Sequence, residues 1–132
     1  MSESPSERLT AAVLVGVGGF LGAVSRHGVD VLIGATAFPF GTLTVNLVGS
    51  FVLGALTPAL GPRRLRLFLA TGLLSSFTTY SAFAVETVRL GPLLGATNVG
   101  ATYALGILAA MAGLAVGHSG RSVIGRNSGG RR

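Results

Sequence analysis

Four long apolar runs divide the chain, and short polar or turn-forming segments separate them. The runs cover residues 9–25, 43–60, 67–87 and 94–116. A hydrocarbon core about 30 Å thick requires roughly 20 residues of helix to cross it. Each run is close to that length, so the pattern predicts an all-α membrane protein with four transmembrane helices joined by short connections.

The two ends of the chain differ from these runs because they are polar. We predict a disordered tail over residues 1–8, a four-helix transmembrane domain over residues 9–117, and a disordered, basic, Gly/Ser-rich tail over residues 118–132. The first run ends at Arg26 rather than at a small-residue cleavage site, so it is not a signal peptide.

Composition supports this interpretation and excludes other classes. Hydrophobic residues make up 49% of the chain and charged residues 11%, whereas a soluble domain has about 25% charged residues. The chain has no cysteine, two histidines and four acids. No nucleophile–base set or metal cluster is visible in it, so we expect no enzymatic activity.

The net charge of +6 comes from arginines at the ends of the apolar runs. This placement fits lipid head groups and membrane topology rather than nucleic acid, which we do not expect as a partner. With four spans, Arg26 and Arg89 belong to one side of the membrane. The positive-inside rule then predicts cytoplasmic termini, because eight arginines share the other side: Arg8, Arg63, Arg64, Arg66, Arg121, Arg126, Arg131 and Arg132.

The segment LLSSFTTYSAF, residues 73–83, places six hydroxyl side chains in an uncharged run. Serine and threonine bond to preceding carbonyls and bend or break helices, and a broken helix frees carbonyl oxygens that bind cations. Tyr80 and Phe83 share a helix face that Glu86 continues, and the edges of aromatic rings attract anions. The same residues also fit one packed helix with both rings in the core.

Other polar residues within or beside the spans also allow two interpretations. Asn46 can donate N–H groups to an anion or bond to a neighbouring helix. Arg26 can reach the head groups or attract anions at a vestibule. Asn98 and Thr102 can continue a polar track or join helices. The spacings Gly18-x-x-x-Gly22 and Gly113-x-x-x-Gly117 indicate close helix packing.

Three motifs together resemble the CrcB/Fluc family of fluoride channels. They are GGFLGAVSRHGV, FGTLTVNLVGSFVLG and SFTTYSAFAVE, and their order and spacing match the family. The resemblance implies an antiparallel dimer with two fluoride pores along its interface, which exports fluoride passively and relieves its toxicity. It also implies a structural Na⁺ at the dimer centre, held by backbone carbonyls.

The same resemblance also implies roles for individual residues in the ion sites. Arg26 corresponds to a vestibule arginine, and the carbonyls of Ser75 and Thr78 correspond to Na⁺ ligands. The residues implied for the fluoride pore are Asn46, Thr79, Tyr80, Ser81, Phe83, Glu86 and Thr102.

The chain departs from the family pattern near the expected break. Ser75 and Ser76 stand where the family has glycines, and serine avoids positive φ, so we expect a restricted backbone there. Tyr80 replaces a phenylalanine and keeps the ring edge, while its added hydroxyl either donates to fluoride or obstructs the path.

The charge bias bears on the assembly. An antiparallel homodimer requires each chain to insert both ways, so its loop charges should nearly balance. Eight arginines against two are unbalanced, which favours a heterodimer with an oppositely oriented homologous subunit over a homodimer.

Two other functions are compatible with four small helices. A proton-coupled multidrug or cation exporter needs a membrane-embedded carboxylate, and Glu86, near a helix end, is the single candidate. A non-transporting membrane scaffold would explain the glycines but not the three motifs together.

Overall fold

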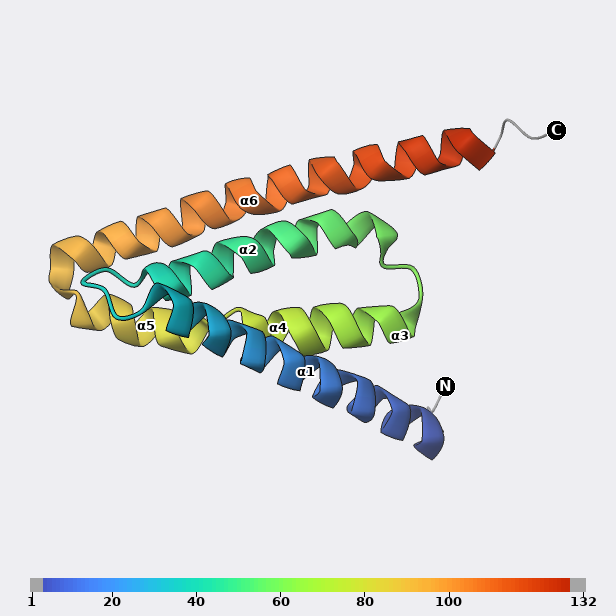
Figure 1. Cartoon of the computed structure of the whole chain (residues 1–132), viewed down its shortest axis with the longest axis horizontal. Helices are drawn as coiled ribbons and strands as arrows, with labels where there is room; N and C mark the ends of the chain where they lie inside the picture. The colour runs from blue at the N-terminus through green and yellow to red at the C-terminus, as the bar shows by residue number, and fades with distance from the viewer. Residues whose placement is uncertain (1–3, 129–132) are drawn as a thin grey trace.

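The computed structural model describes residues 4–128, and their side chains as far as residue 120 (Figure 1). Apart from short connections, the described residues are helical, and they contain no strand. Four segments are long and apolar enough to cross a membrane: Pro5–Ile33, Phe40–Ala59, Arg63–Arg89 and Gly91–Gly120. The prediction of an all-α protein with four spans is confirmed.

The spans are built from helices of different kinds. The third span is a composite in which a wide π-helical stretch, η2, follows one α-helical turn. In chain order the elements are α1 (Pro5–Ile33), α2 (Phe40–Leu56), η1 (Thr57–Ala59), α3 (Arg63–Arg66), η2 (Leu67–Leu74), α4 (Ser75–Phe77), α5 (Tyr80–Arg89) and α6 (Gly91–Ser128).

α1 begins at Pro5, inside the segment expected to be disordered. Ser4 and Glu7 form a capping box: the Glu7 N–H donates to Ser4 Oγ at 3.3 Å, and the Ser4 N–H donates to Glu7 Oε2 at 2.9 Å. The helix runs on to Ile33, so Arg26 lies within it rather than beyond its end. The structure therefore has helix over residues 5–8, where a disordered tail is expected from the sequence, and the Ser4–Glu7 capping box explains this earlier start.

α6 likewise continues to Ser128, beyond the predicted end of the channel domain at residue 117. Ser119 Oγ donates to the carbonyl of Ala115 at 2.9 Å, and His118 Nδ1 lies 2.9 Å from the carbonyl of Leu114. These side chains bond within the helix instead of ending it. The rest of the expected tails, residues 1–3 and 129–132, lies outside the described residues.

The helices pack as two pairs. α1 lies along the third span, and α2 lies along α6 (Figure 1). A Cβ on Gly22 of α1 would collide with the carbonyl oxygen of Leu73, and one on Gly113 of α6 would collide with that of Phe51. Glycine therefore permits backbone contact in both pairs, as the two glycine spacings predicted.

Few side chains are buried within this single chain. Val45, Leu74 and Phe83 are the buried large apolar residues, whereas Leu32 and Leu93 are more than 80% exposed. Lipid tails accept such apolar surface as readily as another helix does, so an outward-facing apolar surface fits a membrane protein.

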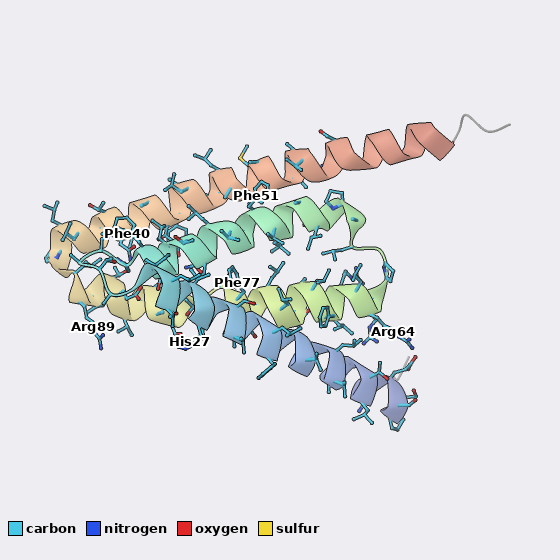
Figure 2. The ribbon with its side chains drawn as sticks, in the orientation of Figure 1. His27, Phe40, Phe51, Arg64, Phe77 and Arg89 are labelled. Atoms are coloured by element: carbon cyan, nitrogen blue, oxygen red, sulfur yellow. The ribbon has the colours of Figure 1, made fainter. Side chains whose placement is uncertain are left out.

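The arginine-rich loop and the outer ends of the terminal helices share one end of the molecule. Figure 1 shows the start of α1, α3 and the end of α6 at that end. Figure 2 shows Arg64 there and Arg89 at the opposite end. This arrangement places the basic loop and both terminal helix ends on one side, as the four-span prediction requires.

Candidate functional site

The third span is interrupted at two residues. Thr78 (φ −76°, ψ 158°) and Thr79 (φ −147°, ψ 122°) have extended backbones between α4 and α5. Asn46 of α2 pairs with the second of them: the Thr79 N–H donates to Asn46 Oδ1 at 2.8 Å, and Asn46 Nδ2 donates to the Thr79 carbonyl at 3.1 Å. Irregular backbone at membrane depth needs such partners, and this interruption is consistent with the expected break.

Thr79 also organises the start of α5. Its Oγ1 accepts the Ala82 N–H at 3.2 Å, an N-cap bond, and lies 3.4 Å from Ser81 Oγ. In a continuous helix the Thr79 N–H would donate to the Ser75 carbonyl four residues earlier. Because it donates to Asn46 instead, the break releases the Ser75 carbonyl from its helical donor.

The two serines before the break introduce no backbone strain. Ser75 has φ −63° and ψ −33°, and Ser76 lies within the helical turn α4. Among the described residues, positive φ occurs at Gly34 and Gly91 and at no non-glycine residue. The expected restriction of the backbone by serine is therefore not observed, because this break uses no positive φ.

A central groove of about 560 Å³ lies beside the break, between the α2–α6 pair and the third span. Its walls come from α2, η2, α4, α5 and α6. The groove brings together seven of the ten residues predicted for ion sites, which are Asn46, Ser75, Thr78, Thr79, Tyr80, Phe83 and Thr102.

Three aromatic rings form a row at this groove. The centroids of Tyr80 and Phe83 lie 5.8 Å apart with the rings tilted by 47°, and Phe83 meets Tyr103 edge-on at 6.1 Å and 89°. Phe83 is 6% exposed, whereas Tyr80 is 74% exposed. Sequence reasoning did not assign Tyr103 to the site, because only the packing of α5 against α6 brings its ring to Phe83.

The two polar candidates on α6 have different surroundings. Thr102 lines the central groove, and its buried Oγ1 has no hydrogen-bond partner among the described residues. Asn98 is 1% exposed and donates from Nδ2 to Thr87 Oγ1 at 2.8 Å. Asn98 therefore joins α6 to α5, and Thr102 is the residue with a hydroxyl available to a ligand.

A second cavity of about 570 Å³, here called the vestibule, lies beside the break and is lined by residues of α1, α2 and α5. Thr79 lines both cavities. The vestibule contains the remaining predicted residues, Arg26, Ser81 and Glu86. It is more highly charged than the central groove, since His27, Asp30 and Arg89 also line it.

Glu86 is held from α2 by a residue that sequence reasoning missed. Thr42, 6% exposed, donates from Oγ1 to Glu86 Oε1 at 2.9 Å. Glu86 Oε2 is buried and has no hydrogen-bond partner among the described residues. The sequence feature that could have identified Thr42 is its four-residue spacing from Asn46, which puts both side chains on one face of α2.

The sequence matches proteins of one kind. The family described as CrcB-like protein, Camphor Resistance (CrcB), matches residues 13–114, a range that contains all ten predicted site residues. "Fluoride-specific ion channel FluC 1" of Natronomonas pharaonis is 53% identical over 106 residues, covering 76% of this chain and 88% of that protein. The resemblance seen in the three motifs is thereby confirmed.

Two further relatives extend the match over most of the chain. "Fluoride-specific ion channel FluC 1" of Listeria monocytogenes is 44% identical over 116 residues, which cover 80% of this chain and 95% of that protein. "Fluoride-specific ion channel FluC 2" of Halobacterium salinarum is 44% identical over 117 residues, which cover 84% and 89%. Their names describe ion channels rather than enzymes.

Proposed function

Because the chain belongs to the CrcB-like protein family, we propose that it is a subunit of a fluoride-selective channel through which fluoride leaves the cytoplasm passively. The observation that carries the proposal is the pair of cavities that meet at Thr79. One is a groove with hydroxyls, an amide and ring edges, and the other is a charged vestibule. Together they form a path along the break for a small anion.

The groove offers donors of moderate strength. Fluoride is small and strongly hydrated, so a pore must replace its water and still release it. The unpartnered hydroxyl of Thr102 can donate to fluoride. Asn46 Nδ2 carries two hydrogens and donates one to Thr79, which leaves the other for an anion. The edges of Tyr80 and Phe83 add weak positive charge.

The vestibule supplies charge at the end of this path. Arg26 attracts anions toward the break, and Ser81 offers a hydroxyl beside Thr79. Glu86 is the acid in the row of α5 residues, and Thr42 satisfies one of its oxygens. We propose that Glu86 lies along this part of the fluoride path, beside Arg26 and Ser81.

We propose further that a second subunit of opposite orientation completes the pore. The central groove is open on one side of the single chain, and exposed apolar residues of α6 such as Tyr103 and Ile107 lie at its edge. The arginine bias supports a single insertion with cytoplasmic termini and hence a homologous partner subunit. A reporter fused to the C-terminus should then respond on one side of the membrane, and a response from both sides would favour a homodimer instead.

The break also offers carbonyl oxygens that are suited to bind a structural Na⁺. The Ser75 carbonyl has lost its helical donor, and Thr78 has an extended backbone, so both carbonyls can face a cation. Neither residue needs positive φ, so the serine at position 75 fits this role. When bound, Na⁺ would hold the breaks of two subunits together by electrostatic attraction.

Fluoride efflux from liposomes tests the proposed function. The purified chain is reconstituted alone, and a fluoride electrode records release, with chloride-loaded vesicles as the control. Rapid release of fluoride but not chloride supports the channel and a homodimer. If the folded chain is silent, an oppositely oriented homologue is added: rescue supports the heterodimer, and continued silence overturns the transport function.

A further inference from the structure

A separate cavity lies far along the bundle from the ion path. It has a volume of about 440 Å³ and shares no lining residue with the central groove or the vestibule. It lies between the start of α1 and the start of the third span, and we call it the rim cavity. Its lining residues are Ser6, Glu7, Thr10, Ala11, Leu14, Arg63, Arg64 and Leu67.

The rim cavity has a polar and an apolar part. Arg63 and Arg64 belong to α3, and Leu67 is the next helical turn inward along the third span. On α1, Leu14 lies eight residues after Ser6, which is about 12 Å along a helix. Both walls therefore change from polar to apolar in the same direction, from the end of the molecule toward its middle.

The length of α1 allows this cavity to lie at the depth of lipid head groups. α1 has 29 residues, a length of about 43 Å, against about 30 Å for the hydrocarbon core. α1 is therefore long enough to extend beyond the hydrocarbon, and its start lies at the end of the molecule that also carries α3 (Figure 1). In this placement the polar part of the cavity would face the head groups, and Leu14 and Leu67 would face the acyl region.

The charge at this end favours an anion. Arg8, Arg63, Arg64 and Arg66 are all exposed. Glu7 is the one acid that lines the cavity, and its Oε2 already accepts from the backbone N–H and the hydroxyl of Ser4 at 2.9 and 3.2 Å.

The guanidinium groups of Arg63 and Arg64 carry five N–H donors each, and Arg63 also interacts electrostatically with Glu7. The Thr10 hydroxyl donates to the Ser6 carbonyl at 2.9 Å, so its proton is used. Arginine forks bind phosphate by paired hydrogen bonds. A cavity lined by two arginines and by Leu14 and Leu67 thus combines the features that bind an acidic phospholipid.

We propose that the rim cavity binds an acidic phospholipid, with its phosphate at Arg63 and Arg64 and an acyl chain against Leu14 and Leu67. The charge complementarity and the polar-to-apolar order of the walls carry this assignment. It does not depend on fluoride conduction.

The test compares Arg64→Gln with Arg66→Gln, an exposed arginine in the same α3 turn that does not line the cavity. Each purified protein is melted in detergent with added phosphatidylglycerol, phosphatidylcholine or inorganic phosphate. We expect phosphatidylglycerol to raise the melting temperature more than phosphatidylcholine for the parent and Arg66→Gln. For Arg64→Gln this difference should fall by at least about half, since one of two phosphate forks is lost.

Three results would overturn the proposal. They are an equal effect of the two lipids on the parent, equal losses in both variants, and full reproduction of the effect by inorganic phosphate. Native mass spectrometry of the parent gives a second measurement that needs no variant. Preferential retention of phosphatidylglycerol supports the site, and retention of both lipids alike argues against it.

Discussion

Asn46 on α2 binds both backbone polar groups of Thr79 in the break of the third span, at 2.8 and 3.1 Å. The residues are 33 positions apart in the chain. The same amide that lines the central groove thus also fixes the extended backbone that forms the groove wall. A change at position 46 therefore affects the ion path and the break together.

Asn46→Asp should reduce fluoride efflux strongly. An ionised carboxylate still accepts the Thr79 N–H but has no hydrogen to donate to the Thr79 carbonyl. An unsatisfied buried group costs about 1 to 3 kcal/mol, and 1.4 kcal/mol corresponds to about tenfold in rate. We expect efflux to be slower by about fivefold or more, measured with the fluoride electrode.

Ser50→Ala is a suitable control for that variant. Ser50 lies one turn further along α2 and lines the same groove, but it makes no bond to the break. Because it removes a groove hydroxyl without touching the break, it should slow efflux less than Asn46→Asp does. An Asn46→Asp channel as fast as the parent would show that the pairing with Thr79 is dispensable.

Gly22→Ala should destabilise the fold, whereas Gly28→Ala should not. A Cβ at position 22 would meet the carbonyl oxygen of Leu73, which is backbone and has little freedom to move, while one at position 28 meets nothing within 4 Å. Overpacking costs about 1 to 3 kcal/mol, and alanine at an open helical position gains about 1 kcal/mol over glycine.

Denaturant unfolding in detergent measures both glycine variants. The free energy of unfolding should fall in Gly22→Ala and rise in Gly28→Ala. Both sites lie on α1 and differ mainly in their neighbours. Equal effects would mean that the close approach of α1 to η2 does not contribute to stability.

Thr42→Val should slow fluoride efflux while Thr42→Ser should not. Valine has nearly the shape of threonine but lacks the hydroxyl that donates to Glu86 Oε1. Both oxygens of Glu86 would then lack a partner among the described residues, which costs about 1 to 3 kcal/mol. Comparison of the two efflux rates, with melting temperatures as a check on folding, tests the pairing; equal rates would contradict it.

Phe83→Ala and Tyr80→Ala should differ in their effect on protein stability, but both should slow fluoride efflux. Phe83 is 6% exposed and packs against Tyr103, so its truncation should cost about 3 to 5 kcal/mol. Tyr80 is 74% exposed, so its truncation should change stability within about 0.5 kcal/mol.

Both aromatic variants should slow fluoride efflux, because each removes a ring edge from the central groove. The efflux rate is compared after the fraction of folded protein has been measured for each sample. An unchanged rate in Tyr80→Ala would remove that ring from the ion path.

Hydropathy and local sequence signals are sufficient to predict the four spans, the contact glycines of α1 and its N-terminal cap. The four spans could be read from the sequence because the length of an apolar run is a local property set by the thickness of the bilayer. Gly18 and Gly22 were predictable as contact residues for the same reason, since their spacing alone places them on one helix face. The capping box of Ser4 and Glu7 was also local, and it explains why α1 begins before the expected position.

Only the tertiary structure decided which partner each polar side chain takes. The pairs Thr42–Glu86 and Asn46–Thr79 join residues 44 and 33 positions apart, and Asn98 joins Thr87 rather than the groove. An amide or hydroxyl in a membrane must find a partner, but periodicity does not specify which one. That choice follows from how α2 and α6 pack against the broken third span, and the same packing divides the predicted site into a groove and a vestibule.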